Sequence, residues 1–173
     1  MKRGLLVAAG VLIVLIASVF VIGARLPREH RASRSAELTV PAESVWVAIT
    51  DVGEFPRWRA EVSRVEQLPD TNGHPVWREH ADYGPMTFEA VEQQAPRRLV
   101  TRIVDRDLGF GGEWTYDITP TAQGSRVTIT ENGYVDSPLF RFMSRFVFGQ
   151  TSTMDGYLRS LGQRFGQTVE PVG

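Results

Sequence analysis

Residues 137–165 read SPLFRFMSRFVFGQTSTMDGYLRSLGQRF, and they follow a run of short segments rich in Trp, Tyr and Phe. At about 100° per residue this stretch predicts one helix of roughly 28 residues after the Ser137-Pro138 start. Polar residues on its inner face would need dedicated partners in a dry core, so the pattern favours a helix that lines a ligand cavity. That face comprises Leu139, Met143, Phe146, Gln150, Thr153, Tyr157, Leu161 and Arg164.

The residues before this helix predict one strand, two short helices and then six more strands. A helix is expected between Pro41 and Gly53, with a second short helix or turn over residues 54–58. Six consecutive strands joined by short turns favour an antiparallel meander. The predicted fold is therefore α+β, with a curved seven-stranded antiparallel sheet around a long C-terminal helix. The expected strands are 30–40, 61–68, 74–81, 86–93, 97–105, 109–119 and 125–135.

Charge and composition exclude several classes of function. The chain has 19 Lys and Arg against 20 Asp and Glu, and acidic residues outnumber basic ones from residue 35 onward. Such a domain lacks the basic patch that nucleic-acid binding needs. Cysteine is absent, which excludes disulfides, thiolate catalysis and cysteine metal sites. Three scattered histidines predict no metal site, and no cofactor motif such as GxGxxG or a P-loop is present.

The N-terminal residues predict a membrane anchor. Residues 4–24 carry no charge and would form a helix of about 31 Å, which matches the hydrocarbon core of a bilayer. A cleaved signal peptide is the alternative, although the apolar run is long for one. The basic residues after the span, Arg25, Arg28, Arg31 and Arg34, nearly balance those before it. Orientation is therefore open, and the short basic start favours a domain outside the cytoplasm.

These features predict four parts along the chain. Residues 1–25 form a single-pass anchor and 26–34 a basic linker beside the membrane, while 35–167 form the folded domain and 168–173 a flexible tail. The linker arginines would lie against lipid headgroups or, alternatively, free in solvent.

Three apolar residues fall off the inner face of the predicted C-terminal helix. Phe140, Val147 and Phe148 could enter the bilayer in a tethered domain. The alternative is partial burial against neighbouring loops.

Four short motifs carry a resemblance to a known family. They are PAESVW at 41–46, FPRW at 55–58, GEWTY at 112–116 and VTITENG at 127–133. In this order, over about residues 32–166, the chain resembles the SRPBCC or START-like superfamily, and most closely its polyketide cyclase/dehydrase-like branch. The resemblance implies a helix-grip fold with a cavity for hydrophobic or amphipathic small molecules. Lipid transfer, hormone binding, aromatic cyclisation and chaperone regulation all occur in the superfamily, so the fold restricts function only weakly.

Glu131 is the strongest candidate for chemistry. It shares strand parity with Val127 and Ile129, which directs its carboxylate toward the cavity if the strand is regular. The nearby Gly133 could instead turn it to solvent. A buried carboxylate has a raised pKa unless it is paired, and Arg102 is a possible partner on a neighbouring strand.

Other titratable and aromatic residues are weaker candidates. His80, Glu79, Asp82 and Tyr83 lie together near a predicted strand end and could serve as acid or base groups. Most aromatics are expected in the core, and a minority are expected to contact a ligand. The expected ligand-binding residues are Phe55, Trp58, Trp77, Phe88, Arg102, Phe110, Trp114, Tyr116, Glu131, Met143, Phe146 and Tyr157.

The sequence therefore favours a membrane-anchored module that binds or carries a lipid, isoprenoid or polyketide-like molecule without altering it. One alternative is a cyclase or dehydratase in which Glu131 acts with Tyr116 or His80. Another is a non-catalytic regulatory subunit of a membrane complex. The expected partners are a hydrophobic small molecule and the lipid bilayer around residues 4–24, while any protein partner stays open.

Overall fold

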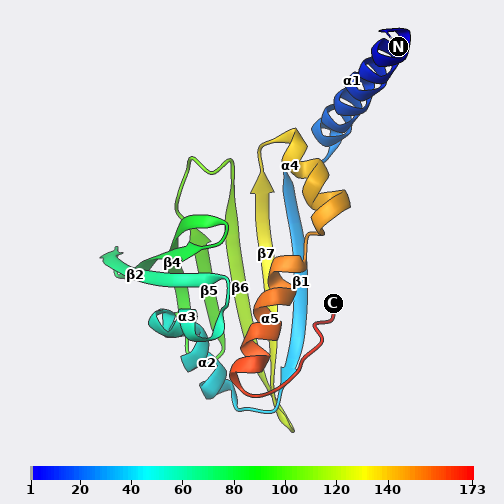
Figure 1. The fold of residues 1–173 in the computed structure, drawn as a ribbon. Coiled ribbons are helices and arrows are strands. Elements are labelled where there is room, and N and C mark those ends of the chain that lie inside the picture. The colour runs from blue at the N-terminus through cyan, green and yellow to red at the C-terminus, as the bar shows by residue number, and fades with distance from the viewer. Residues whose placement is uncertain (1) are drawn as a thin grey trace.

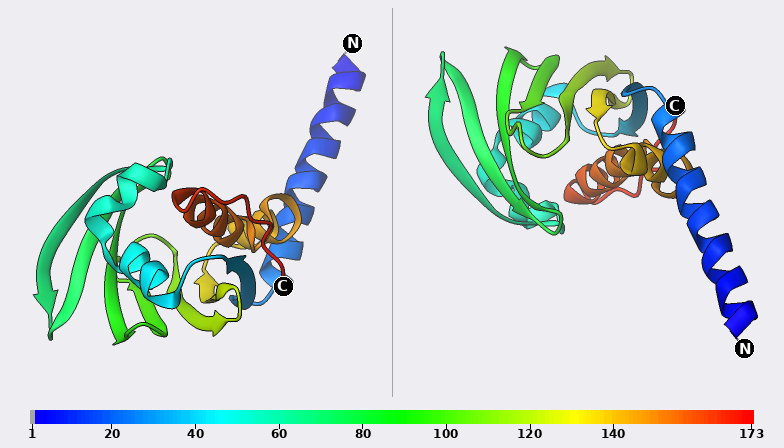
Figure 2. Two further views of the ribbon diagram at one scale, coloured as in Figure 1. Left: turned by 90° about the horizontal axis from the view of Figure 1, so that it is seen from below. Right: turned by 90° about the horizontal axis from the view of Figure 1, so that it is seen from above.

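The computed structural model describes residues 2–173 and contains one curved antiparallel sheet with helices packed on its concave side (Figures 1 and 2). The helices are α1 Lys2–Arg25, α2 Ala42–Thr50, α3 Phe55–Trp58, α4 Pro138–Met143 and α5 Ser152–Arg164, with a 3-10 turn η1 Val52–Glu54 and a π-helical turn η2 Ser144–Phe148. The strands are β1 Glu29–Leu38, β2 Val62–Thr71, β3 His74–Ala81, β4 Gly84–Gln94, β5 Arg98–Ile103, β6 Phe110–Thr121 and β7 Gly124–Val135.

The strands lie in the order β1-β7-β6-β5-β4-β3-β2, and every neighbouring pair is antiparallel. This confirms the predicted seven-stranded antiparallel sheet. Strands β2 to β7 form the meander through short turns, such as the β2–β3 turn where Asn72 and Gly73 take φ of 53° and 82°. β1 pairs with β7, with Ala32 opposite Glu131, so the first strand closes one edge beside the last.

The core lies between the concave face of the sheet and helices α2 and α5. Ile129 on β7 and Leu158 and Leu161 on α5 are fully buried. They meet because side chains alternate along a strand and recur every three to four residues on a helix. Burying each such side chain contributes about 1.5–3 kcal/mol, which holds α5 on the sheet. An ion pair between Arg34 of β1 and Asp155 of α5, with 2.5 Å between Nε and Oδ1, adds an edge contact.

The C-terminal helix is not the single element that the sequence predicts. After α4 the chain makes the turn η2, and Gly149 then takes φ 79° and ψ 146° before α5 begins. Residues other than glycine rarely adopt this conformation, so Gly149 ends the first helical segment. The continuous inner face predicted over residues 139–164 is wrong for its first half, because Leu139 and Phe146 are exposed whereas Tyr157 is buried.

Two predicted boundaries also differ from the structure. β1 begins at Glu29, so residues 29–34 belong to the sheet and not to a linker. The tail predicted to be flexible lies along β1, where the amide of Ser35 donates to the carbonyl of Val172 at 2.7 Å. Val169 is buried against the core. Backbone pairing and burial of this kind order a terminal segment that has no regular sequence pattern.

α1 projects away from the domain and meets it at α4 (Figures 1 and 2). Gly23 lies so close to Pro138 that an added Cβ would clash with the Pro138 carbonyl. Most large apolar side chains from Val11 to Ile22 are exposed. Among the described residues no helix is long and apolar enough to cross a membrane. The membrane span predicted for residues 4–24 gains no support from that finding.

Candidate functional site

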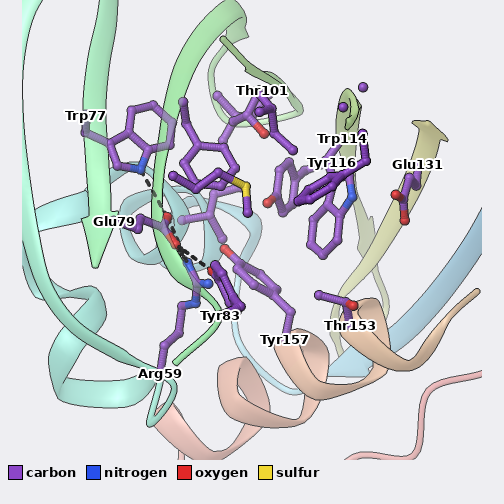
Figure 3. Close-up of a pocket in the computed structure, with 18 of the residues that line it drawn as sticks. Arg59, Trp77, Glu79, Tyr83, Thr101, Trp114, Tyr116, Glu131, Thr153 and Tyr157 are labelled. Carbon is purple, nitrogen blue, oxygen red and sulfur yellow. Dashed lines mark hydrogen bonds and ion pairs between the residues drawn. The ribbon is translucent and has the colours of Figure 1, made fainter. Parts of the chain in front are cut away.

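A cavity of about 380 Å³ lies between the concave face of the sheet and α5 (Figure 3). Strands β3 to β7 supply most of its walls, and α5 contributes Thr153 and Tyr157. Phe110 and Tyr83 line the cavity and are themselves exposed, so it reaches the surface beside them. Sites for small organic ligands have roughly 300–1,000 Å³ and mostly apolar walls with a few fixed polar groups. The cavity satisfies these conditions.

Aromatic side chains form much of the cavity wall. Trp77 and Phe88 lie opposite each other on β3 and β4 and stack with ring centroids 5.7 Å apart. Across the cavity Tyr157 of α5 contacts Trp114 and Tyr116 of β6, with centroid separations of 5.9 and 5.5 Å. Mutual packing of this kind holds the rings in defined orientations. The walls therefore present flat apolar surfaces to a ligand from both the sheet and the helix.

A buried ionic cluster lies on one side of the cavity (Figure 3). Arg59 follows α3, and its guanidinium contacts the Glu61 carboxylate at 2.9 Å and the Glu79 carboxylate at 3.0 Å. Glu79 is only 2% exposed and also accepts hydrogen bonds from Trp77 Nε1 at 3.1 Å and from the Tyr83 hydroxyl at 3.4 Å. Buried charges persist only when they are paired and hydrogen-bonded in this way.

Burial keeps the hydroxyl groups of the cavity protonated. It raises the pKa of Tyr116 and Tyr157 well above the ordinary tyrosine value. The Tyr83 ring is half exposed, but its hydroxyl lies against Glu79, and partial burial together with that charge raises the pKa of Tyr83 to about 12. Burial is the largest single influence on Arg59 and disfavours its cation, but the Glu79 and Glu61 carboxylates and the neighbouring tyrosines together outweigh it and raise the pKa of Arg59. At neutral pH the cavity thus presents neutral hydroxyl donors beside a fixed ion pair. Such groups can orient a carbonyl or hydroxyl oxygen but are poor general bases.

Glu131 lies across the cavity from Glu79 (Figure 3) and forms a second polar pair with His30, which also lines the cavity. Both side chains are partly buried, and Glu131 Oε1 lies 3.4 Å from His30 Nε2. A carboxylate hydrogen-bonded to an imidazole is a pair of groups of the kind that act as general acid and base in enzymes. Among residues 2–173 no group of three or more His, Asp or Glu side chains is placed to hold a metal ion.

The structure brings together most of the residues that the sequence predicts to bind a ligand. They come from α3, β3, β4, β6, β7 and α5, which lie far apart along the chain. Their contact with a ligand stays a prediction. The cavity-lining members of the predicted set are Phe55, Trp77, Phe88, Phe110, Trp114, Tyr116, Glu131 and Tyr157.

Two predicted polar residues lie away from the cavity. Thr101 and Ile103 of β5 line it, so Arg102 between them points to the convex face, where it pairs with Glu89 at 2.8 Å. Arg102 is therefore not the partner of Glu131. His80 is likewise on the outer face of β3, where its Nε2 lies 2.8 Å from Arg64 Nη2.

Three predicted apolar residues also fall outside the cavity lining. Met143 and Phe146 precede the break at Gly149, so they do not continue the inner face of α5. Trp58 packs edge-on against Tyr157, with ring centroids 5.4 Å apart, and has no direct place in the cavity wall.

Arg59 and Glu79 are the main cavity residues that sequence reasoning missed as ligand contacts. The sequence places Glu79 together with His80 and Asp82 near the end of a predicted strand. The parity of Glu79 with Trp77 is the signal that could have separated Glu79 from them, because alternate residues share one face of a strand. Arg59 offers no such signal, since its position depends on how α3 packs against β2 and α5.

The geometry agrees with a sequence family described as polyketide cyclase/dehydrase and lipid transport. Its match covers residues 29–166, which include all seven strands and α5. The chain belongs to this family. The resemblance to the START-like superfamily and its polyketide cyclase-like branch is thereby confirmed. A comparison with curated proteins found no match to this chain.

Solved structures share the fold of this polyketide cyclase/dehydrase family member at low sequence identity. A START superfamily protein from Mycobacterium smegmatis is 18% identical with a TM-score of 0.63, over 78% of this chain and 96% of that one. A Thermus thermophilus protein is 21% identical with a TM-score of 0.61, over 79% and 95%. The di-domain ARO/CYC protein StfQ from the steffimycin biosynthetic pathway is 12% identical with a TM-score of 0.63. That alignment covers 80% of this chain, which spans 52% of StfQ.

Proposed function

We propose that this protein binds a hydrophobic small molecule with a polar oxygen group and carries or presents it without chemical change. The observation that carries the proposal is the cavity of about 380 Å³, with aromatic walls and a buried ionic cluster. The apolar body of the ligand would contact Trp77, Phe88 and Trp114, while its oxygen would meet the hydroxyl groups beside Arg59. Lipids, isoprenoids and polyketide-like molecules share this chemistry.

The charges of the cluster favour a neutral polar group on the ligand. Arg59 faces two carboxylates, those of Glu61 and Glu79, so no positive charge is left uncompensated. An anionic ligand group placed there would be repelled, whereas a ketone or alcohol could accept or donate a hydrogen bond. We therefore expect alcohols and ketones to bind more tightly than carboxylic acids of the same size.

Attachment to a lipid bilayer through residues 4–24, with the domain outside the cytoplasm, is part of the proposal. The exposed apolar side chains of α1, such as Leu12, Ile13 and Leu15, support attachment. Fractionation of cells that make the full chain tests it. Recovery of the protein mainly in the membrane fraction after alkaline washing is expected, and recovery in the soluble fraction would contradict attachment.

Binding in the cavity is tested with 1-naphthol, a neutral aromatic alcohol, and two tryptophan variants of the full chain. Thr153→Trp places an indole on the cavity wall, whereas Ser152→Trp places it at the exposed neighbouring position outside the lining. We expect Thr153→Trp to weaken naphthol binding about tenfold relative to Ser152→Trp. Naphthol that binds to other apolar surfaces of the protein would affect both variants equally, so the difference between them reports binding in the cavity. Equal affinities of the two variants, or no binding by the unaltered chain, would contradict the proposal.

Acid–base catalysis of cyclisation or dehydration is the second candidate function, and the Glu131–His30 pair favours it. The partners suggested by the sequence are less suitable, because Tyr116 stays protonated and His80 faces away. Glu131→Gln keeps the size of the side chain but removes its basicity. Conversion of a linear poly-β-ketone thioester, followed by mass spectrometry, should then disappear. Turnover equal to that of the unaltered chain would exclude a role for Glu131.

A further inference from the structure

An arginine pocket lies at the junction of α1, β1, α4 and η2. Its volume is about 310 Å³, and among the described residues that line it Glu29 is the only acidic one. Of its arginines only Arg28 has a carboxylate partner among residues 2–173, the Asp136 side chain at 2.6 Å. The local charge is therefore positive, which attracts an anion. The arginines of this pocket are Arg28, Arg31, Arg141 and Arg145.

Arg141 is held rigidly in this pocket. Its Nη1 donates to the Leu26 carbonyl at 2.8 Å and its Nη2 to the Asp136 carbonyl at 3.0 Å. Its Nε is buried and has no hydrogen-bond partner within the described part of the chain. A buried N–H without a partner is costly. Arg141 thus ties the end of α1 to α4 and keeps a cationic group in a fixed position.

An apolar patch adjoins the arginine pocket on α4 and η2. It consists of Phe140, Phe146, Val147 and Phe148, which are 62%, 59%, 57% and 61% exposed. Four large apolar side chains exposed within residues 140–148 are unusual on a soluble surface and indicate an interaction site. α1 extends the patch, since it contacts α4 at Gly23 and exposes apolar side chains of its own. α1 and α4 lie on the same side of the domain in Figures 1 and 2.

The arginine pocket and the ligand cavity are neighbours. His30 and Val135 line both, so these two side chains separate one space from the other. A phosphate bound among the arginines would therefore lie beside the entrance region of the cavity. Apolar chains attached to that phosphate would face the apolar patch.

We propose that the arginine pocket and the apolar patch form a docking face for a bilayer that contains anionic phospholipid. Lipid phosphates bind the arginines without carboxylate partners, and the patch enters the boundary between headgroups and acyl chains. Cationic groups beside exposed aromatic side chains are complementary to such a surface in both charge and polarity. The purpose of docking rests on the proposed carrier function, because it places the cavity next to a source of hydrophobic ligands.

Site-specific fluorescence on the full chain tests the docking face. The chain has no cysteine, so Val147→Cys and Asp70→Cys each accept a single NBD label. Val147 lies in the patch, whereas Asp70 belongs to β2, the edge strand at the opposite side of the sheet from β1. We expect the label at 147 to shift to the blue and to be quenched by lipids with a doxyl group on the acyl chain. The vesicles contain phosphatidylcholine with phosphatidylglycerol, and the label at 70 should stay in water.

Charge variants separate the arginine pocket from the patch. Arg31→Gln with Arg145→Gln should weaken the response to phosphatidylglycerol vesicles by about fivefold per arginine. The matched pair Arg64→Gln with Arg97→Gln, exposed and outside the pocket lining, should leave it unchanged. Equal responses to phosphatidylcholine alone, or a water-like label in both vesicle types, would overturn the proposal.

Two further measurements distinguish membrane docking from binding of free phosphate and from ligand binding in the cavity. Suppression of the label response by inorganic phosphate at micromolar concentration would indicate a site for free phosphate and would also overturn it. Naphthol binding by the cavity does not enter these measurements. The docking face can therefore fail while the carrier function stands, and the reverse also holds.

Discussion

Glu79 shows at the scale of one residue how the polar side of the cavity is held together. Its carboxylate is nearly inaccessible and is contacted by Arg59, Trp77 and Tyr83. Removing one partner of a buried ion pair leaves the other charge uncompensated, which costs about 3–5 kcal/mol. Arg59 keeps Glu61, whose side chain is 35% exposed, as a second partner. Removal of the Glu79 charge should therefore lower the free energy of unfolding by an amount at or below the lower end of that range.

Glu79→Gln is predicted to lower the free energy of unfolding by about 2–3 kcal/mol, because Arg59 stays buried with only one carboxylate. Urea unfolding of the full chain, followed by tryptophan fluorescence, measures the change. Glu54→Gln is the control, since its pair with Arg57 is at the surface, where the arginine is 76% exposed. A change below about 0.5 kcal/mol is expected for the control. Similar effects of both variants would show that burial of the pair is not decisive.

The buried tyrosines predict a loss of stability at high pH. Burial raises the pKa of Tyr116 and Tyr157 well above the usual value, and partial burial beside the Glu79 carboxylate raises that of the half-exposed Tyr83 to about 12. In the unfolded chain tyrosines ionise near pH ~10. Below about pH 10 these tyrosines are protonated in both states and do not lower the free energy of unfolding. Above that pH the unfolded state loses their protons while the folded state keeps them, so the free energy of unfolding declines.

Urea unfolding between about pH 8 and about pH 12 measures this decline. The double variant Tyr116→Phe with Tyr157→Phe removes two of the groups responsible, so its stability should fall less steeply with pH. A slope identical to that of the unaltered chain would mean that other groups cause the alkaline loss.

At the scale of elements, two glycines of the C-terminal region have opposite roles. Gly149 adopts a positive φ of 79° between η2 and α5, whereas Gly156 lies inside α5, where an added Cβ meets no atom within 4 Å. A side chain at Gly149 would be strained, which costs about 1–3 kcal/mol. A side chain at Gly156 would reduce the entropy of the unfolded chain and favour the helix by about 0.5–1 kcal/mol.

Gly149→Ala is therefore predicted to lower the free energy of unfolding and Gly156→Ala to raise it. Urea unfolding of the two single variants gives both signs in one series. Stabilisation by Gly149→Ala would mean that the break between η2 and α5 closes into one continuous helix. That result would restore the element that the sequence pattern alone predicts.

The meander and its hairpins could be predicted because their signals are local. Alternation in the strands and turn residues such as Asn72-Gly73 act over a few neighbouring positions. The break in the C-terminal helix was missed, because helical spacing continues on both sides of residues 149–151, where the chain leaves the helix. Gly149 is the one local signal for it, since glycine is common just after the end of a helix. The pairing of Val172 with Ser35 was inaccessible, since it joins the two ends of the domain.

At the scale of the whole molecule, a ligand that binds the folded cavity and not the unfolded chain must raise stability. 1-Naphthol at 100 times its dissociation constant should increase the free energy of unfolding by about 2.7 kcal/mol. The melting temperature of the full chain should rise with naphthol concentration. At the same naphthol concentration Thr153→Trp, which binds about tenfold more weakly, should gain only about 1.4 kcal/mol, whereas Ser152→Trp should keep the full increase. A rise of equal size in both variants would place the binding outside the cavity.

The docking face and the cavity depend on contacts between segments that are distant in sequence. The arginine pocket joins residues 28–31 to residues 141–145, and the ionic cluster joins Arg59 to Glu79. The local sequence of each segment predicts only a basic linker, a turn of helix or the end of a strand. Only packing of β1 on β7, and of α3 on the sheet, turns these separate charges into sites.

The sequence left Glu131 open between the cavity and solvent, and the structure places it in the cavity lining. The order of elements and the antiparallel sheet followed from the sequence alone. They did so because strand alternation is a short-range property that survives folding unchanged. The tertiary structure decided which charges are buried together, where the terminal helix breaks and that Arg102 faces outward. These outcomes depend on the balance between desolvation and pairing across the whole fold, which no local pattern records.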